Sequence, residues 1–148
     1  MKRIRFLALL ILALMMTACA TGPKYSETKS AIPTLSADQG RIYFYRSSSM
    51  FGAAIQPTIM LNGAAAGDSK PGGFFFIDQA PGSKEVSTTT EVEKKLTFVL
   101  DARQTRYVKT VSGLGLVAGR VYPELVDEAT AQKEIEEMSY IGKPLVQR

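Results

Sequence analysis

The sequence contains no histidine, no tryptophan and a single cysteine among its 148 residues. The absence of histidine removes the side chain that most often serves as a general base or a metal ligand near neutral pH. One cysteine cannot form a disulfide within the chain, so the fold must be stable without such a cross-link. What the chain does have is enough apolar material for one domain, since 45% of its residues are hydrophobic.

The N-terminus has the three parts of a secretory signal peptide. Lys2, Arg3 and Arg5 are basic, an unbroken run of 11 apolar residues covers 6–16, and small residues follow. A helix of this length spans roughly 16 Å, whereas the hydrocarbon core of a bilayer is about 30 Å thick. The run is therefore too short for a permanent span, and residues 1–18 are predicted to be a cleaved signal.

Cys19 follows this signal, and the sequence MTAC at 16–19 resembles the lipobox of bacterial lipoproteins. Met16 stands where the lipobox usually has Leu, Val or Ile. The resemblance implies cleavage after Ala18, a thioether-linked diacylglycerol on Cys19, and acylation of the new amine with a fatty acid such as palmitate. Two or three acyl chains hold a protein firmly at a membrane, whereas one holds it only marginally.

The residue after the cysteine is Ala20. Aspartate at this position commonly signals inner-membrane retention in Gram-negative lipoproteins, so the resemblance points to the outer membrane, with the protein facing the periplasm. The alternative is a secreted protein without lipid, in which Cys19 is incidental.

Removal of the signal changes the charge balance. The whole chain carries 18 basic and 14 acidic residues, and loss of Lys2, Arg3 and Arg5 leaves 15 basic residues against the same 14, a net charge of +1. No basic stripe or base-stacking module is left to indicate binding of a nucleic acid. With Cys19 acylated, no thiol is available for a metal or a nucleophile, and the sequence predicts no cofactor.

The rest of the chain divides into a linker and a domain. Residues 19–39 are rich in Ser, Thr, Pro and charge and have no period, so they predict a flexible tether. Residues 40–148 predict short strands, because β-branched and aromatic runs alternate with turn residues. The strands are expected at 41–46, 56–63, 74–79, 85–92, 95–101 and 104–112, with a short return strand after Asn62-Gly63. The pattern is typical of an antiparallel sandwich or barrel, and we expect an antiparallel β-sandwich of about seven strands.

Two stretches depart from simple strand alternation. The continuous apolar run within 74–79 predicts a strand that is buried on both faces or covered at one end. After the strands, Ala131, Ile135 and Met138 recur at helical spacing, and Asp127 is a suitable N-cap. The sequence therefore predicts one C-terminal helix over 127–139, packed on an edge or face of the sheet.

Five stretches of the domain together carry a family resemblance. They are GRIYFYR at 40–46, PTIMLNG at 57–63, GGFFFIDQAPGSKEV at 72–86, LTFVLDARQTRYVKT at 96–110 and LVDEATAQKEIEEM at 125–138. This order of landmarks is similar to a family of small bacterial lipoproteins with domain of unknown function 2846. Ser83-Lys84 stands where a histidine is frequent in that family, and Asp101-Ala102-Arg103 replaces a turn with glycine. The resemblance implies a compact β-rich domain on a lipid anchor and names no activity.

Two groups of residues are candidates for contact with a partner. Gly113, Gly115 and Gly119 have a G-x-G-x-x-x-G spacing, one residue off the dinucleotide fingerprint, and no βαβ context surrounds them. We interpret this stretch as a flexible loop between sheet and helix that can contact a partner. Tyr43 and Tyr45 share one face of a predicted strand, where they either pack in the core or form an exposed platform for a glycan or a protein.

Three functional hypotheses remain. The favoured one is a non-enzymatic lipoprotein, attached to the outer membrane through Cys19, that binds an envelope protein or glycan or supports the envelope structurally. The second is a hydrolase or glycan-processing enzyme, for which two carboxylates must face each other across a cleft; Asp68 with Asp78 or Glu91 with Glu93 are the available pairs. The third is a surface-exposed lipoprotein that excludes phage or plasmids. The sequence predicts no catalytic residues and no metal site.

Overall fold

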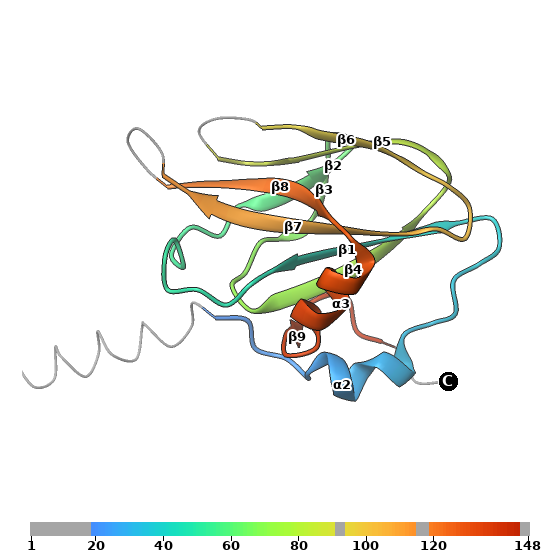
Figure 1. Ribbon diagram of the computed structural model, residues 1–148, viewed down its shortest axis with the longest axis horizontal. Helices are drawn as coiled ribbons and strands as arrows, with labels where there is room; N and C mark the ends of the chain where they lie inside the picture. The colour runs from blue at the N-terminus through green and yellow to red at the C-terminus, as the bar shows by residue number, and fades with distance from the viewer. Residues whose placement is uncertain (1–18, 91–93, 115–118, 146–148) are drawn as a thin grey trace, which may run out of the picture.

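The computed structural model describes residues 19–90, 94–114 and 119–145, which form two packed β-sheets with two short helices on one side (Figure 1). The elements follow the chain in the order α2 (Tyr25–Thr28), the 3-10 turn η1 (Lys29–Ala31), β1 (Gly40–Arg46), β2 (Thr58–Leu61), β3 (Ala64–Asp68), β4 (Gly73–Gln79), β5 (Gly82–Thr88), β6 (Leu96–Leu100), β7 (Thr105–Gly113), β8 (Arg120–Val126), α3 (Glu128–Ile135) and β9 (Ser139–Tyr140). The predicted β-sandwich is confirmed, and the predicted signal at 1–18 lies outside the described residues.

The two sheets differ in strand order. The larger has five strands in the order β8-β7-β1-β4-β9, and the smaller has four in the order β3-β2-β5-β6. Most neighbouring strands are antiparallel, as predicted, but β1 pairs with β7 in parallel, and so does β4 with β9. The first parallel pair arises because the chain leaves the larger sheet after β4, builds β5 and β6 in the smaller one, and re-enters beside β1.

The turn between β2 and β3 is the tight hairpin that the sequence predicts. Asn62 and Gly63 have φ angles of 50° and 79°, which glycine and asparagine adopt more readily than other residues. The side-chain oxygen of Asn62 also accepts a hydrogen bond of 2.8 Å from the backbone N–H of Glu85. This bond fixes the hairpin against β5, its neighbour in the smaller sheet.

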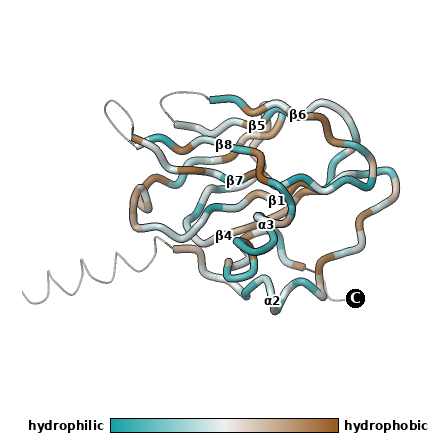
Figure 2. Tube along the Cα trace, in the orientation of Figure 1, coloured by the Kyte–Doolittle hydropathy of each residue, from teal (hydrophilic) through white to brown (hydrophobic). Residues whose placement is uncertain are grey.

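The core lies between the two sheets. Its fully buried side chains come from both of them and include Ile42, Phe44, Val108, Ile59, Val86 and Leu100. Alternate residues along each strand point to opposite faces, so β1 sends Ile42 and Phe44 inward and Tyr43 and Tyr45 to the other face. Figure 2 shows hydrophobic residues, coloured brown, along strands of both sheets.

Helix α3 covers the outer face of the larger sheet. Asp127 is its N-cap, and its carboxylate accepts a hydrogen bond of 2.9 Å from the N–H of Thr130, as predicted. Ala131 and Ile135 are buried. The predicted end at 139 is wrong: the helix stops at Ile135 because the chain turns there, and residues 139–140 become β9 and pair with β4.

The prediction of a flexible tether also fails for the segment after Cys19. The N–H of Ala20 donates to the carbonyl of Pro71 over 3.0 Å, and Lys24 forms a β-bridge with Ser139. Tyr25 packs edge-on against Phe74, with ring centroids 5.4 Å apart. The segment lacks a period because its helix is only one turn long, yet it covers the part of the larger sheet that α3 leaves open.

Candidate binding groove

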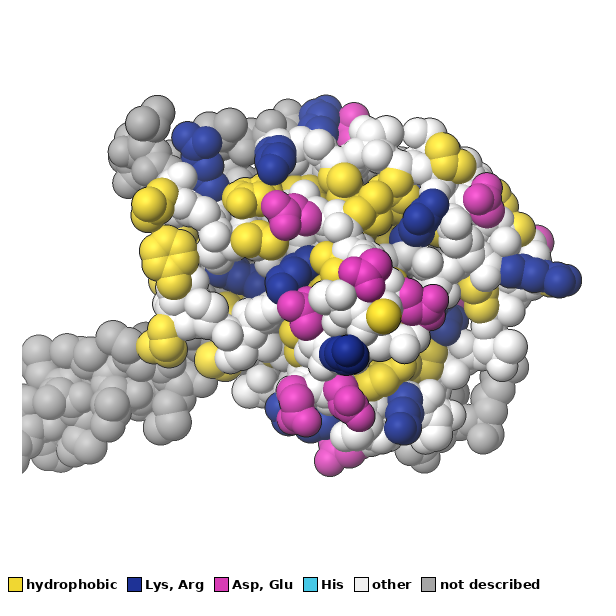
Figure 3. All heavy atoms as spheres, viewed as in Figure 1, with side chains coloured by type: hydrophobic (Ala, Val, Ile, Leu, Met, Phe, Trp, Pro, Cys, Tyr) yellow, Lys and Arg dark blue, Asp and Glu magenta, His cyan; other side chains and the backbone are white. Residues whose placement is uncertain are grey.

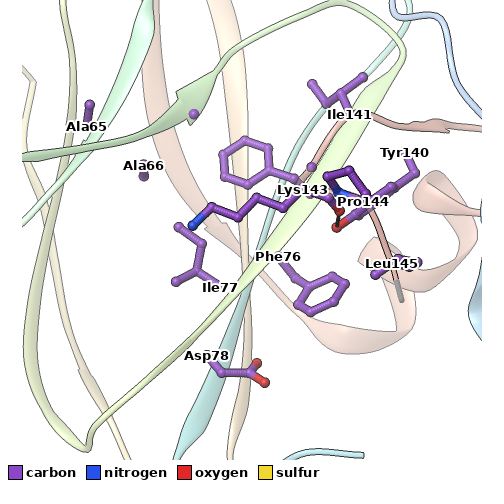
Figure 4. Close-up of a pocket in the computed structure, with 13 residues that line it drawn as sticks. Ala65, Ala66, Phe76, Ile77, Asp78, Tyr140, Ile141, Lys143, Pro144 and Leu145 are labelled. Atoms are coloured by element: carbon purple, nitrogen blue, oxygen red, sulfur yellow. Dashed lines mark hydrogen bonds between the residues drawn. The ribbon is translucent and has the colours of Figure 1, made fainter. Parts of the chain in front are cut away.

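A groove of about 640 Å³ opens along one side of the sandwich, between the edge strands of the two sheets (Figure 4). Three separate stretches line it: residues 65–67 of β3, residues 75–78 of β4, and residues 140–145 after α3. Most of its lining is apolar, and the side chains drawn in Figure 4 converge on it from all three stretches. Grooves of this size and character are common ligand sites in proteins.

Small residues bring β3 close to β4. A Cβ atom on Gly67 would lie 2.7 Å from the Phe75 ring, which is nearer than real Cβ contacts, so no side chain fits there. The pairing of β2 with β3 is also irregular between Ile59 and Met60, which bends this edge. Ala65 and Ala66 then form a shallow wall that leaves the groove open.

The third wall is held by two hydrogen bonds. The N–H of Ile141 donates to the carbonyl of Phe74 over 2.9 Å, and the hydroxyl of Tyr140 donates to the carbonyl of Lys143 over 2.8 Å. The second bond closes a turn that places Pro144 and Leu145 over the groove. Nothing in the sequence pattern predicts this wall, because residues 141–145, which follow β9, belong to no regular element.

The outer edge of β4 lies in the groove. The strand pairs with β1 along its whole length but with β9 only at Gly73 and Phe74. The predicted strand covered at one end is thereby confirmed: Gly73, Phe74 and Phe75 are buried, and the residues after them are half-buried. Among the described residues, no strand pairs with this edge beyond Phe74.

The hydrogen bonds of β4 show in which direction its remaining backbone groups point. The carbonyl of Phe74 points away from β1, since it accepts from Ile141. Backbone groups alternate in direction along a strand, so those of Phe76 and Asp78 also point away from β1. As far as the described residues go, two N–H and two C=O groups are therefore available at this edge, and such a row can pair with a further strand.

Asp78 and Lys143 are the charged side chains that line the groove, and Asp78 is paired with Arg41. Arg41 donates to both carboxylate oxygens, over 2.6 and 2.7 Å, and to the carbonyl of Pro33 over 2.9 Å. The guanidinium also lies 4.4 Å from the Phe76 ring centroid. Burial alone would lower the pKa of Arg41, but the hydrogen bonds and the charge of Asp78 raise it, so the guanidinium stays charged. The carboxylate is thus committed to a structural pair.

The tyrosines proposed as a partner platform are buried. Tyr43 and Tyr45 are only 7% and 2% exposed, because the N-terminal segment and α3 cover that face. Tyr43 stacks on Tyr107 with centroids 5.3 Å apart, and burial raises its pKa to about 12. The hydroxyl of Tyr45 donates to Glu134 over 2.8 Å. The core alternative is therefore correct, and the exposed platform is not.

The glycine-rich stretch connects two strands rather than a strand and a helix. Gly113 ends β7 and pairs with Arg120 of β8, a strand that the sequence did not predict. Gly119 is half-buried against Ile55. Gly115 lies outside the described residues, so whether the stretch contacts a partner stays a prediction.

Cys19 is exposed, and its lipidation stays a prediction. Of the candidate carboxylates, Asp68 accepts from the Thr58 hydroxyl over 3.3 Å, and Glu91 and Glu93 lie outside the described residues. Across 19–90, 94–114 and 119–145, no cluster of His, Cys, Asp or Glu could hold a metal ion. Within the same ranges, no helix is both long and apolar enough to cross a bilayer.

One protein-family model, described as "Protein of unknown function (DUF2846)", matches residues 36–120, which is more than half of the chain. The match includes two walls of the groove, β3 and β4, and ends before residues 140–145. No curated protein and no solved structure matches the chain.

Proposed function

We propose that this chain, which belongs to the DUF2846 family of proteins of unknown function, is a lipid-anchored protein of the cell envelope that binds an extended, apolar segment of a partner protein in the groove beside β4. The observation that carries the proposal is the free edge of β4 at Phe76 and Asp78, which lies within an apolar groove.

Strand addition fits this geometry. An extended peptide that joins a sheet edge gains main-chain hydrogen bonds, while pockets for alternate side chains provide selectivity. Here Ile77, Ile141 and Leu145 offer apolar surface beside the free backbone groups (Figure 4). Lys143 extends along the groove and can meet a carboxylate of the bound segment.

The anchor is the other half of the proposal. The lipobox-like sequence at 16–19 and the exposure of Cys19 support lipidation at this residue. The chain joins the domain at the next residue, Ala20, through its bond to Pro71. A lipid on Cys19 would thus hold the folded domain close to the membrane, and Ala20 favours the outer membrane, facing the periplasm.

The hydrolase hypothesis is less well supported. Asp78 is the carboxylate that lines the groove, and its two oxygens are already bonded to Arg41. The exclusion hypothesis requires the domain to face outward. Protease treatment of intact cells separates that orientation from a periplasmic one.

Photocrosslinking in living cells tests the groove. A benzophenone amino acid replaces Ala65, which is exposed on the groove wall, and a matched variant carries it at Thr97, which is exposed on β6 at the other edge of the same sheet. We expect one crosslinked protein from position 65 and none from position 97, with the attachment mapped to an apolar, strand-forming segment.

A groove-filling variant sharpens the test. Ala66→Trp places a large ring in the groove, so the crosslink from position 65 should be lost if the partner occupies that space. Equal crosslinking from positions 65 and 97, or a crosslink that survives Ala66→Trp in a folded protein, would rule out the groove as the binding site.

A further inference from the structure

Three large hydrophobic side chains are exposed on two loops of the sandwich. Met50 and Phe51, between β1 and β2, are 85% and 54% exposed, and Leu114, just after β7, is 83% exposed. Scattered apolar residues are normal on a protein surface, but a cluster of large ones marks a contact surface. We refer to Met50, Phe51 and Leu114 as the apolar tip.

The two loops lie side by side because Arg46 joins them. Its guanidinium donates to the carbonyl of Gly52 over 2.8 Å and to the hydroxyl of Ser112 over 2.6 Å. Gly52 is in the loop of Met50 and Phe51, and Ser112 is two residues before Leu114. Hydrophobic side chains gather along the left edge of the molecule in Figure 3, where Figure 1 places this end of the sandwich.

The chain enters the domain at the same end. Ala20 is bonded to Pro71, and the N–H of Gly72 donates to the carbonyl of Arg46, the residue before the loop of the tip. Cys19 is therefore separated from this end by a single residue. The opposite end, where β6 turns into β7, lies one strand length away, about 20 Å for the seven residues of β1.

The geometry points to a lipid surface as the partner of the apolar tip. This inference rests on the proposed lipidation of Cys19, because an anchor at that residue brings this end of the domain against the bilayer. The tip then enters the interface, where amphipathic surfaces bury their apolar side chains about 5–10 Å deep. The domain is held in one orientation rather than swinging on its anchor.

The charges around the tip suit this partner. Arg120 of β8 pairs with Gly113 of β7, beside Leu114. Tyr122 is also on β8, and the Nζ atom of Lys94 lies 4.2 Å from its ring centroid. Cations beside apolar and aromatic side chains are typical of surfaces that meet lipid phosphates.

A depth-sensitive fluorophore tests the inference in the full-length, lipidated chain. The dye is attached through Phe51→Cys, or through Val99→Cys as the matched control. Val99 is 56% exposed, like Phe51, but lies near the opposite end on β6, next to the turn into β7. Each protein is reconstituted into vesicles of phosphatidylethanolamine and phosphatidylglycerol that carry bromine on the acyl chains. Flotation of the vesicles reports the anchor separately.

We expect the dye at position 51 to be blue-shifted and quenched severalfold more than the dye at 99. Met50→Ser combined with Leu114→Ser should weaken the quenching while the protein still floats. Equal, weak quenching at both positions in a protein that floats would refute membrane contact by the apolar tip, while the lipid anchor on Cys19 would remain supported. A blue shift without quenching means that protein covers the tip, which also overturns the inference. A chain that fails to float refutes the anchor, and the inference with it.

Discussion

Tyr25→Ala measures how firmly the segment after Cys19 belongs to the fold. The side chain is half-buried and its ring meets Phe74 edge-on. Complete burial of a large apolar side chain contributes about 1.5–3 kcal/mol, so half-burial contributes about 1 kcal/mol. An aromatic pair adds about 0.5–1.5 kcal/mol. The variant should therefore lose about 2 kcal/mol of the free energy of unfolding.

Thermal unfolding of the mature chain, made soluble by Cys19→Ala, is the suitable assay. For a domain of this size, a loss of about 1 kcal/mol in the free energy of unfolding lowers Tm by about 3–5 °C. Tyr25→Ala should therefore lower Tm by about 6–10 °C. Thr34→Ala, at an exposed position of the same segment, should change the free energy of unfolding by less than about 0.5 kcal/mol. An unchanged Tm for Tyr25→Ala would refute the packed segment and restore the flexible tether.

Two further predictions concern the rest of the fold. Leu100→Ala, at a fully buried position, should cost about 2–5 kcal/mol in urea unfolding, whereas the exposed neighbour Val99→Ala should stay within about 0.5 kcal/mol; equal losses would contradict the core assignment. Burial of Glu134 by itself would raise the pKa of its carboxyl group. The hydrogen bonds from Lys109 and Tyr45 outweigh this effect and lower the pKa below its ordinary 4.5. Its ionised form therefore stabilises the fold above pH 4.5, and this contribution is lost as pH falls through the lowered pKa. The unsubstituted chain should therefore be more stable than Glu134→Gln near neutral pH, and this difference in the free energy of unfolding should shrink as the pH falls below 4.5. A difference that grew on acidification would disprove the pairing of Glu134 with Lys109 and Tyr45.

The sequence predicted those elements that short-range chemistry determines. Apart from β3, the strands from β1 to β7 follow alternating, β-branched or aromatic runs. The Asn62-Gly63 turn has the conformation that its residues favour, and Asp127 caps the helix that follows it. These features depend on neighbours along the chain, which the sequence shows directly.

The failures have longer-range causes. Strand β8 contains Pro123, which argues against a central strand, but β8 lies at the edge of its sheet, where proline is tolerated. The two-residue alternation places Tyr43 and Tyr45 on one face without showing that α3 and the segment after Cys19 cover it. The groove combines β3, β4 and residues 140–145, and their meeting depends on the tertiary fold.

The most direct test of the anchored state is the mass of the N-terminal peptide of the mature chain, isolated from membranes. We expect the peptide to begin at Cys19 and to carry the mass of a diacylglycerol and an amide-linked acyl chain, and Cys19→Ala to leave the membrane fraction. A peptide that begins at another residue, or an unmodified Cys19 in a protein that stays on the membrane after a salt wash, would contradict lipid anchoring.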